Sequence, residues 1–337
     1  MNILITGGCG FLGARLARTL LQQGSLSLAG AAPRAINRIT LADRVAPPED
    51  LRADPRIASA EGDLLELIAS GQGLPADTDL VFHLAAAVSG ECEADFDLGM
   101  RSNLEATQVL LQACRALGSK PVLVFSSSVA VFGDSPEQPL PPVITDTTLP
   151  TPQNSYGIQK FIGEQLVADC TRKGFVRGRS VRLMTVSVRP GRPNAAASSF
   201  LSGMLREPLA GQRATCPVPP DTAVALSSPG NTVAGLIRAA TASDGEWGAR
   251  TAVNLPALTI TVREMAQALE RVAGPAATAL IAWQPDAQIA KIVTSWPSRI
   301  QATRAKGLGL EADASFEAII RAYAQENPDA VKLEVRG

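Results

Sequence analysis

The stretch Thr6–Gly13, TGGCGFLG, lies near the start of the chain and decides its fold. The apolar run before it, residues 1–5, predicts a short buried strand. After it, leucines recur at helical spacing over residues 12–21, with arginines on the opposite side. Glycines placed between a buried strand and an amphipathic helix are typical of a turn that holds a nucleotide pyrophosphate.

Each glycine of the turn has an expected task. Gly7 permits a tight turn, Gly10 carries no side chain that would keep phosphates away, and Gly13 lets the helix pack closely. The helix start, at Phe11 and Leu12, offers free backbone N–H groups and a partial positive charge to the pyrophosphate. We therefore expect a doubly wound α/β fold of the Rossmann type that binds a dinucleotide.

The composition is that of an ordinary globular protein of 337 residues, with 46% hydrophobic and 19% charged residues. A net charge of −1 and 4% aromatic residues argue against nucleic-acid or membrane partners. There is no apolar run long enough to span a bilayer and no secretion signal, so we expect a cytoplasmic protein. Five scattered cysteines and a single histidine predict reduced thiols and no metal centre.

The second predicted strand, residues 39–42, ends at Asp43. A carboxylate at this place binds both ribose hydroxyls of the adenosine half of NAD and repels the 2′-phosphate of NADP. Arg44 beside it is a type of residue that binds a phosphate, so the sequence leaves open how strongly NAD is preferred over NADP. After the third strand, residues 56–59, we expect Asp63 and Leu64 to contact the adenine.

The fourth strand, residues 79–84, leads into alanines. We expect Leu84, Ala85 and Ala86 to let the cofactor approach the backbone closely. His83 is interpreted as a buried residue that shapes the pocket rather than as an acid or base.

A long amphipathic helix is predicted over residues 96–117, with Asn103 as a polar residue within it. Asn103 either satisfies backbone groups near the nicotinamide end of the cofactor or faces water. The fifth strand, residues 121–125, runs into Ser126–Ser128, over the crevice where α/β sheets bind ligands. The Pro- and Thr-rich residues 134–152 predict an irregular loop over the site.

Tyr156 and Lys160 are four residues apart in a helix predicted over residues 155–171, so they share one face. A Tyr side chain has a reference pKa near 10, and a nearby ammonium and a positive nicotinamide both favour the phenolate. Tyr156 is thus the expected general base for an alcohol that loses hydride to the cofactor. Ser128 is expected to hold the same oxygen, and Lys160 to bind the nicotinamide ribose as well.

Beyond a sixth strand, residues 180–190, the alternation weakens. Shorter elements follow, expected near residues 200–206, 231–241, 253–255, 262–272 and 315–325. We therefore expect a dinucleotide-binding domain over residues 1–188 and a mainly substrate-binding region over residues 189–337. Segments near residues 225–255 are expected to return to the first domain.

These motifs together resemble the extended short-chain dehydrogenase/reductase superfamily, the NAD-dependent epimerases, dehydratases and related dehydrogenases. The resemblance implies that the third serine, Ser128, is the catalytic one, that Val186 contacts the cofactor, and that the chain forms a homodimer through the helices at 96–117 and 155–171. Cys9 and Phe132 depart from the usual pattern without removing a catalytic group. The motifs are GGCGFLG (7–13), HLAA (83–86), SSS (126–128) and YGIQK (156–160).

Stretches at residues 88–100, 186–200 and 216–220 resemble the D-erythronate dehydrogenase family. That resemblance implies NAD-dependent oxidation of the C2 hydroxyl of a small sugar acid, D-erythronate to 2-oxo-tetronate. A carboxylate substrate needs a cation or N–H donors. The candidate substrate-binding residues, besides Ser128 and Tyr156, are Ser89, Arg189, Arg192 and Asn194.

Three other functions are alternatives to this oxidation. A nucleotide-sugar epimerase that retains NAD needs many diphosphate contacts, yet residues 195–255 are poor in clustered Arg and Lys. A dehydratase places an acid pair where Val129 and Ala130 stand. A non-catalytic NAD-binding protein has no need of the set Ser128, Tyr156 and Lys160. The substrate's chain length and stereochemistry stay open.

Overall fold

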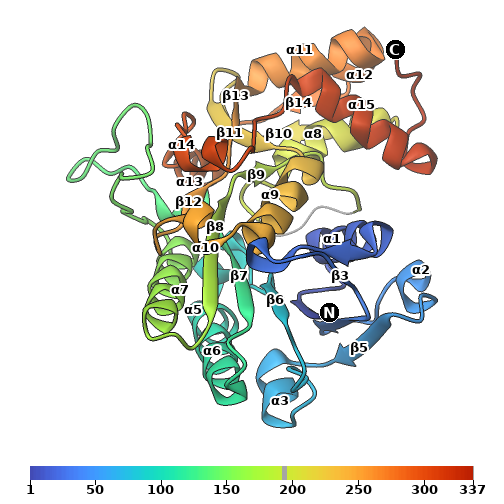
Figure 1. Cartoon of the computed structure of the whole chain (residues 1–337). Coiled ribbons are helices and arrows are strands. Elements are labelled where there is room, and N and C mark those ends of the chain that lie inside the picture. The colour runs from blue at the N-terminus through green and yellow to red at the C-terminus, as the bar shows by residue number, and fades with distance from the viewer. Residues whose placement is uncertain (192–195, 337) are drawn as a thin grey trace.

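The computed structural model describes residues 1–191 and 196–336. Within these residues, seven parallel strands form a central sheet in the order β12-β8-β7-β6-β1-β4-β5, which confirms the predicted Rossmann-type fold (Figure 1). The strands are β1 (Asn2–Thr6), β4 (Arg38–Asp43), β5 (Ile57–Glu61), β6 (Leu80–His83), β7 (Val122–Ser128), β8 (Arg177–Leu183) and β12 (Val253–Asn254).

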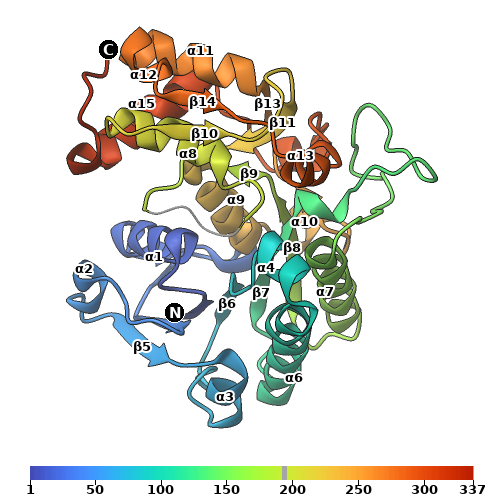
Figure 2. The same ribbon diagram turned by 180° about the vertical axis from the view of Figure 1, so that it is seen from behind.

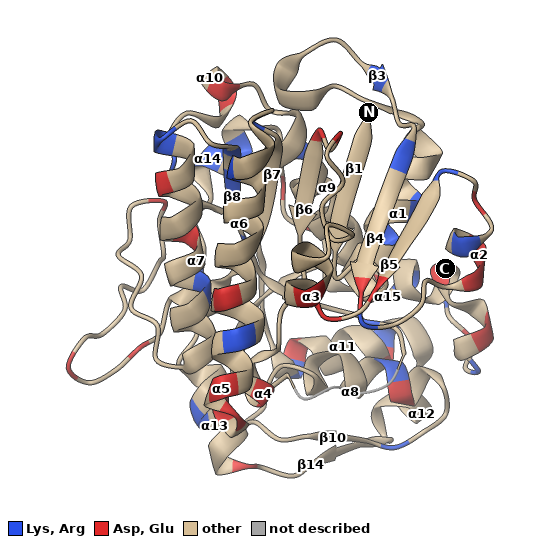
Figure 3. Ribbon diagram, turned by 90° about the horizontal axis from the view of Figure 1, so that it is seen from below, with Lys and Arg blue, Asp and Glu red and all other residues tan. Residues whose placement is uncertain are grey.

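Both faces of the sheet are covered by helices. Ile3 and Ile5 point to a core formed with α1 (Phe11–Gln23), α9 (Pro229–Thr241) and α14 (Thr303–Gly307). Leu4 points to the opposite core, formed with α3 (Leu64–Ala69), α6 (Ala106–Leu117) and α7 (Ser155–Arg172). Because successive side chains of a strand face opposite ways, a strand buried on both faces reads as a continuous apolar run. Figure 3 shows α6 and α7 on the near side of the sheet and α1 behind it.

The strand order reverses at β1. From β1 the chain moves outward to β4 and β5, and then returns to β6 on the other side of β1. The carboxyl ends of β1 and β6, at Thr6 and His83, therefore flank a topological switch point. In open α/β sheets this crevice is where ligands bind.

A second group of elements packs around its own apolar core, at the top of Figures 1 and 2. It contains α8 (Phe200–Leu209), β10 (Ala214–Cys216), β11 (Ala223–Ser227), β13 (Leu258–Thr261), α11 (Val262–Ala273), α12 (Pro275–Thr278), β14 (Ile281–Trp283), α13 (Ala287–Thr294) and α15 (Phe316–Glu326). Two segments of this half return to the large sheet, since β12 pairs with β8 and α9 packs on its face.

One expectation about elements was wrong, and a second is confirmed with a change of helix type. The strand expected over residues 180–190 ends at Leu183, because the next residues form β9 (Thr185–Val186), which pairs with β11 in a different sheet. The helix expected over 96–117 is confirmed, although its type changes along its length. It comprises α5 (Phe96–Gly99), a π-helical segment (Met100–Glu105) and α6.

The remaining elements are short and connect the larger ones. None of the helices in the described residues is long and apolar enough to cross a membrane. These short elements are β2 (Ser25–Leu26), β3 (Arg34–Ala35), α2 (Glu49–Arg52), α4 (Ser89–Ala94), α10 (Asp244–Trp247) and the 3-10 turns Leu28–Gly30, Val129–Val131 and Pro328–Ala330.

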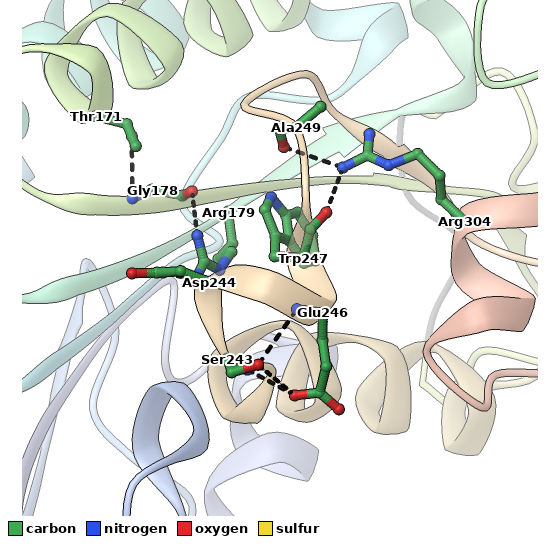
Figure 4. Close-up of polar contacts among 9 residues, drawn as sticks. All are labelled: Thr171, Gly178, Arg179, Ser243, Asp244, Glu246, Trp247, Ala249 and Arg304. Carbon is green, nitrogen blue, oxygen red and sulfur yellow. Dashed lines mark hydrogen bonds and ion pairs between the residues drawn. The ribbon is translucent and has the colours of Figure 1, made fainter.

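Trp247 ties the C-terminal α14 to the edge of the sheet (Figure 4). Its indole lies between the guanidinium groups of Arg179 on β8 and Arg304 on α14, at 5.2 and 5.7 Å from the ring centroid. Arg304 also donates to the Trp247 and Ala249 carbonyls, at 2.9 and 3.0 Å. Asp244 pairs with Arg179. These contacts connect residues that lie far apart in the sequence.

The loop over residues 134–152 is anchored by the segment 295–301. The Asp134 N–H donates to the Ser295 carbonyl at 2.9 Å, and the Ile144 N–H donates to the Arg299 carbonyl at 2.9 Å. The Gln301 N–H returns a bond of 2.7 Å to the Ile144 carbonyl. The loop and the C-terminal segment are thus paired through their main chains.

Candidate active site

Two adjoining cavities of about 310 and 410 Å³ lie at the carboxyl edge of the sheet. Both are lined by Gly7, Gly10, Leu84 and Ala86, so they meet at the glycine-rich turn. The first cavity also contains the candidate catalytic residues, and the second contains the acidic residues that end β4 and follow β5. We name them the catalytic cavity and the adenosine-side cavity.

The glycine-rich turn is as tight as its sequence predicts. Gly7 has a φ of +67°, and a Cβ there would lie 2.8 Å from the Ala85 nitrogen. A Cβ at Gly13 would lie 2.1 Å from the Gly7 carbonyl oxygen, so this glycine lets α1 pack against the turn itself. Among the described residues no side chain caps α1, whose N-cap is Gly10. Its first N–H groups are therefore free to bind an anion.

Asp43 lines the adenosine-side cavity at the end of β4. Its carboxylate accepts a hydrogen bond of 2.9 Å from the Cys9 N–H, which joins it to the glycine-rich turn. The neighbouring Arg44 forms an ion pair of 2.8 Å with Asp63. Burial, with Asp43 adding to it, raises the pKa of the Cys9 thiol to about 11, so this unusual residue of the turn stays uncharged.

Asp63 also lines this cavity, together with Leu64. Its carboxylate caps α3 by accepting the Leu65 N–H at 3.0 Å, and it pairs with Arg44 and Arg101. Burial works to raise its pKa, but these bonds outweigh burial and hold the pKa below its usual value. The expected adenine contact of Asp63 stays a prediction.

His83 is a satisfied core histidine, as interpreted from the sequence. Its Nδ1 lies 2.7 Å from the Thr6 hydroxyl and its Nε2 lies 2.9 Å from the Thr107 hydroxyl. Because Thr107 donates its proton to the Asn103 carbonyl at 2.6 Å, it accepts from Nε2–H of a neutral ring. Burial, with Lys160 nearby, lowers the pKa of His83 to about 3.

Ser128, Tyr156 and Lys160 line the catalytic cavity together. Ser128 ends β7, and Tyr156 and Lys160 lie in the first turns of α7, which Asn154 caps by accepting the Gly157 N–H at 2.8 Å. The Lys160 ammonium donates to the Ser126 carbonyl at 2.8 Å and lies 5.7 Å from the Tyr156 ring centroid. The structure therefore brings together the three side chains that the sequence predicted to share a site.

The pKa values of this set differ from the sequence-based expectation. Burial raises the pKa of Tyr156 to about 12, while its hydrogen bond with Ser128 and the charge of Arg189 act in the opposite direction. Burial also lowers the pKa of Lys160 to about 8. The expected lowering of the Tyr156 pKa was wrong for the protein alone, because the loss of water around the phenol outweighs the neighbouring charges.

Asn103 is buried and does not face water. Its amide oxygen accepts the Ala87 N–H at 2.8 Å, and its amide nitrogen donates to the Ala87 carbonyl at 3.2 Å and to Gln159 at 2.9 Å. It holds the backbone that follows β6 against α7. A direct contact with cofactor stays a prediction, as it does for Val186, which lines the catalytic cavity.

The candidate substrate residues are only partly described. Ser89 lines the catalytic cavity, and its hydroxyl accepts the Ala197 N–H at 3.3 Å. Arg192 and Asn194 lie outside the described residues. Arg189 lines the cavity, and within the described residues its guanidinium contacts the Ser198 hydroxyl alone, at 3.5 Å. Burial and the neighbouring Arg206 lower the pKa of Arg189.

Sequence reasoning missed a buried ion pair behind the catalytic set. Glu164 of α7 accepts two bonds from Arg182 of β8, at 2.8 and 2.7 Å, and one from the Ser127 hydroxyl at 2.5 Å. The ion pair joins β7, β8 and α7 beside Ser128. Its sequence signal was the position of Glu164, one helical turn beyond Lys160. Sequence reasoning also missed Trp296, which lines the catalytic cavity and has no local signal.

The donor set fits a dinucleotide. The glycine turn and the uncapped α1 provide for a diphosphate, and Asp43 provides for ribose hydroxyls. With Ser, Tyr and Lys at the other end, the fold and site define a nicotinamide-dependent oxidoreductase of the short-chain type. The chain belongs to the NAD dependent epimerase/dehydratase family, whose model matches residues 3–247. Its cofactor is NAD, which accepts and returns hydride when bound.

Relatives of known name match nearly the whole chain. A D-erythronate dehydrogenase of Cupriavidus necator is 52% identical over 326 residues, which cover 97% of this chain and 98% of the relative. A D-erythronate dehydrogenase of Haemophilus influenzae is 42% identical, with 96% and 99% covered. A solved structure of a nucleoside-diphosphate-sugar epimerase from Agrobacterium tumefaciens is 39% identical, with a TM-score of 0.85 and 98% and 95% covered.

Proposed function

We propose that this protein oxidises the C2 hydroxyl of D-erythronate to 2-oxo-tetronate with NAD as hydride acceptor. Two D-erythronate dehydrogenases that match at 52% and 42% identity over nearly their full lengths support this activity. The observation that carries the proposal is the Arg189 guanidinium, which lines the cavity of Tyr156 and, among the described residues, hydrogen-bonds only to the neutral Ser198 hydroxyl.

A guanidinium taken partly out of water is costly unless an anion pairs with it. Arg189 contacts one hydroxyl at 3.5 Å among the described residues, whereas Arg206 behind it has its own partner, Glu207. The planar fork of Arg binds a carboxylate by two parallel bonds. A carboxylate held by Arg189, beside Tyr156, leaves the adjacent carbon, C2, to present its hydroxyl to the phenol.

In the proposed reaction, the Tyr156 phenolate takes the proton of the C2 hydroxyl, and bound NAD would accept the C2 hydride. The Ser128 hydroxyl orients the reacting oxygen, and the Lys160 ammonium favours the phenolate and would bind the nicotinamide ribose. The products are the 2-oxo acid, a protonated Tyr156 and the reduced cofactor, so atoms and charge balance.

The other proposed roles follow from position. Residues 1–188 would bind NAD and residues 189–337 mainly the substrate, with segments near 225–255 completing the first part, as the pairing of β12 with β8 supports. The proposed cofactor contacts are Gly7, Gly10, Phe11, Leu12, Gly13, Asp43, Asp63, Leu64, Leu84, Ala85, Ala86, Asn103 and Val186, with Tyr156 and Lys160.

The test is an assay of the purified protein with NAD⁺ and a panel of sugar acids. We expect NADH to form with D-erythronate, and much less NADPH with NADP⁺, because Arg44 is paired with Asp63 and Asp43 repels a 2′-phosphate. Absence of NADH with every acid would refute the proposal. The alternative, an epimerase that retains NAD, would interconvert a nucleotide sugar without net reduction, and the epimerase relative justifies including one in the panel.

We also propose a homodimer. Phe96 of α5 and Ile158 and Ile162 of α7 are large apolar side chains with 61%, 46% and 37% of their surface exposed. Their helices pack on each other, so these residues form an apolar face on one side of the molecule. Sedimentation at micromolar concentration checks this state.

A cytoplasmic location is proposed on the cysteines. All five are free, and Cys92, Cys114 and Cys216 are buried, as suits a reducing compartment. Cell fractionation tests this proposal, and recovery outside the cytoplasmic fraction would contradict it.

A further inference from the structure

Trp296 is the largest side chain among the described residues that line the catalytic cavity. Ser89, Ala196 and Ser198 line the same cavity with small side chains, and Arg189 lines it as well. Trp296 comes from the C-terminal half and packs on the apolar core of that half. A bulky aromatic ring in the wall of a cavity that small residues also line is a feature that sets the size of the bound molecule.

The position of Trp296 is fixed from both sides along the chain. Before it, the Ser295 carbonyl accepts the Asp134 N–H at 2.9 Å. After it, the pairing of Ile144 with Arg299 and Gln301 holds the chain at 2.9 and 2.7 Å. The Trp296 N–H itself donates to the Val293 carbonyl at 3.3 Å at the end of α13. The backbone therefore cannot move without breaking main-chain bonds to the loop.

The indole is held by packing and not by a hydrogen bond. Its Nε1–H is buried without a partner among the described residues. A phenylalanine at this position would thus lose contact area but no hydrogen bond. This makes a graded series of substitutions possible, in which the wall shrinks without a new unpaired polar group.

We propose that Trp296 is the wall that limits the chain length of the sugar acid. This inference rests on the proposed function, because Arg189 and Tyr156 must first hold the carboxylate and C2. Once these are fixed, C3 and C4 occupy what remains of a cavity of about 310 Å³ that also receives the nicotinamide end of the cofactor. Trp296 then excludes acids with five or six carbons.

The experiment compares four-, five- and six-carbon 2,3-dihydroxy acids of the same configuration at C2 and C3. We expect Trp296→Ala to raise the ratio of kcat/KM for the five-carbon acid to that for the four-carbon acid about tenfold or more. Trp296→Phe should give a smaller rise. Trp283→Ala is the matched control, because Trp283 lies on the surface at the end of β14 with 41% exposed and should leave the ratio unchanged.

A binding measurement separates packing from chemistry. In a Tyr156→Phe background with NAD⁺ present, calorimetry should show the four-carbon acid binding about tenfold more weakly after Trp296→Ala. Thermal unfolding of Trp296→Phe verifies that the fold persists. If a folded Trp296→Phe or Trp296→Ala protein shows the same ratio of kcat/KM for the five-carbon acid to that for the four-carbon acid, Trp296 does not limit the chain length. If the unmodified protein oxidises none of the acids, the proposed function is wrong, and the proposed role of Trp296 is wrong as well.

Discussion

Arg189 and Tyr156 line the same cavity, but their side chains have different neighbours. The backbone of Arg189 is held by α8, since its N–H donates to the Ser202 hydroxyl at 3.0 Å and its carbonyl accepts from Arg206 at 2.8 Å. Within the part of the chain that the structure describes, its side chain hydrogen-bonds to Ser198 alone. The backbone of Arg189 is thus held in place, which positions the guanidinium for binding a ligand.

Replacing Arg189 tests the carboxylate site. We expect Arg189→Met to raise the KM for D-erythronate by a factor on the order of 100, because a charge-assisted bond in a partly dry site is worth about 3 kcal/mol. The KM for NAD⁺ should change little. Steady-state kinetics measure both values, with the exposed Arg177→Met as control. Equal losses for acid and cofactor would contradict the assignment.

The pH dependence of the reaction follows from Tyr156. Its pKa is raised to about 12 in the protein alone, so the phenolate is the minor form near neutral pH and its fraction grows tenfold for each unit of pH below that pKa. We expect kcat/KM for oxidation to rise between pH 6 and 9 at saturating NAD⁺. Lys160→Met should lower kcat/KM most below about pH 8, where Lys160 is still an ammonium that favours the phenolate. A rate independent of pH would exclude Tyr156 as the base.

At the scale of elements, β7, β8 and α7 are joined by Glu164, Arg182 and Ser127. The Glu164 and Arg182 side chains have 2% and 6% of their surface exposed, so this ion pair is shielded from water. Arg182 also lies 4.8 Å above the Phe132 ring. The pair therefore fixes the helix of Tyr156 and Lys160 relative to the strand of Ser128.

Breaking that pair should cost far more than breaking a surface pair. We expect Glu164→Gln to lower the free energy of unfolding by about 3–5 kcal/mol, because Arg182 is left buried without its partner. Asp169→Asn on the same helix, whose pair with Arg172 is more than half exposed, should cost less than about 1 kcal/mol. Urea unfolding measures both variants. Similar losses of unfolding free energy in the two variants would show that burial does not decide how much an ion pair stabilises this protein.

The elements with strong local signals were predictable, and those that depend on distant partners were not. The strand and helix of residues 1–23 could be predicted because a glycine-rich turn between an apolar run and an amphipathic pattern is compatible with few other structures. Gly157 after Tyr156 also has a physical reason, since a Cβ there would lie 2.1 Å from the Ala130 carbonyl oxygen. In contrast, β9 separates from β8 only because β11, some 40 residues later, pairs with it. Trp296 reaches the cavity through pairing with residues 134–144, which no local pattern encodes.

At the scale of the whole molecule, contacts between distant segments join the two halves. Arg15 of α1 forms two bonds of 2.6 Å with Glu326 of α15, and Arg304 and Trp247 fasten α14 to the sheet. The exposed surface of α5 and α7 includes the large apolar side chains of Phe96, Ile158 and Ile162.

The apolar face gives the prediction at this scale. We expect the double substitution Phe96→Asp and Ile162→Asp to convert the proposed dimer into a monomer, because two charges on each copy would be buried against each other. Leu149→Asp is the control, since Leu149 is 66% exposed in the loop over 134–152. Sedimentation velocity distinguishes the states. A protein that sediments as a monomer before substitution would refute the dimer.

The pairing of Ile144 with Arg299 and Gln301 also sets an order of events during synthesis. The glycine turn, Ser128, Tyr156 and Lys160 have all left the ribosome before β12, at residues 253–254, can complete the sheet. The wall at Trp296 follows some 40 residues later, and the bonds that fix it need Arg299 and Gln301. A growing chain therefore acquires its reactive groups early, and the wall that selects the substrate only after Arg299 and Gln301 have been added.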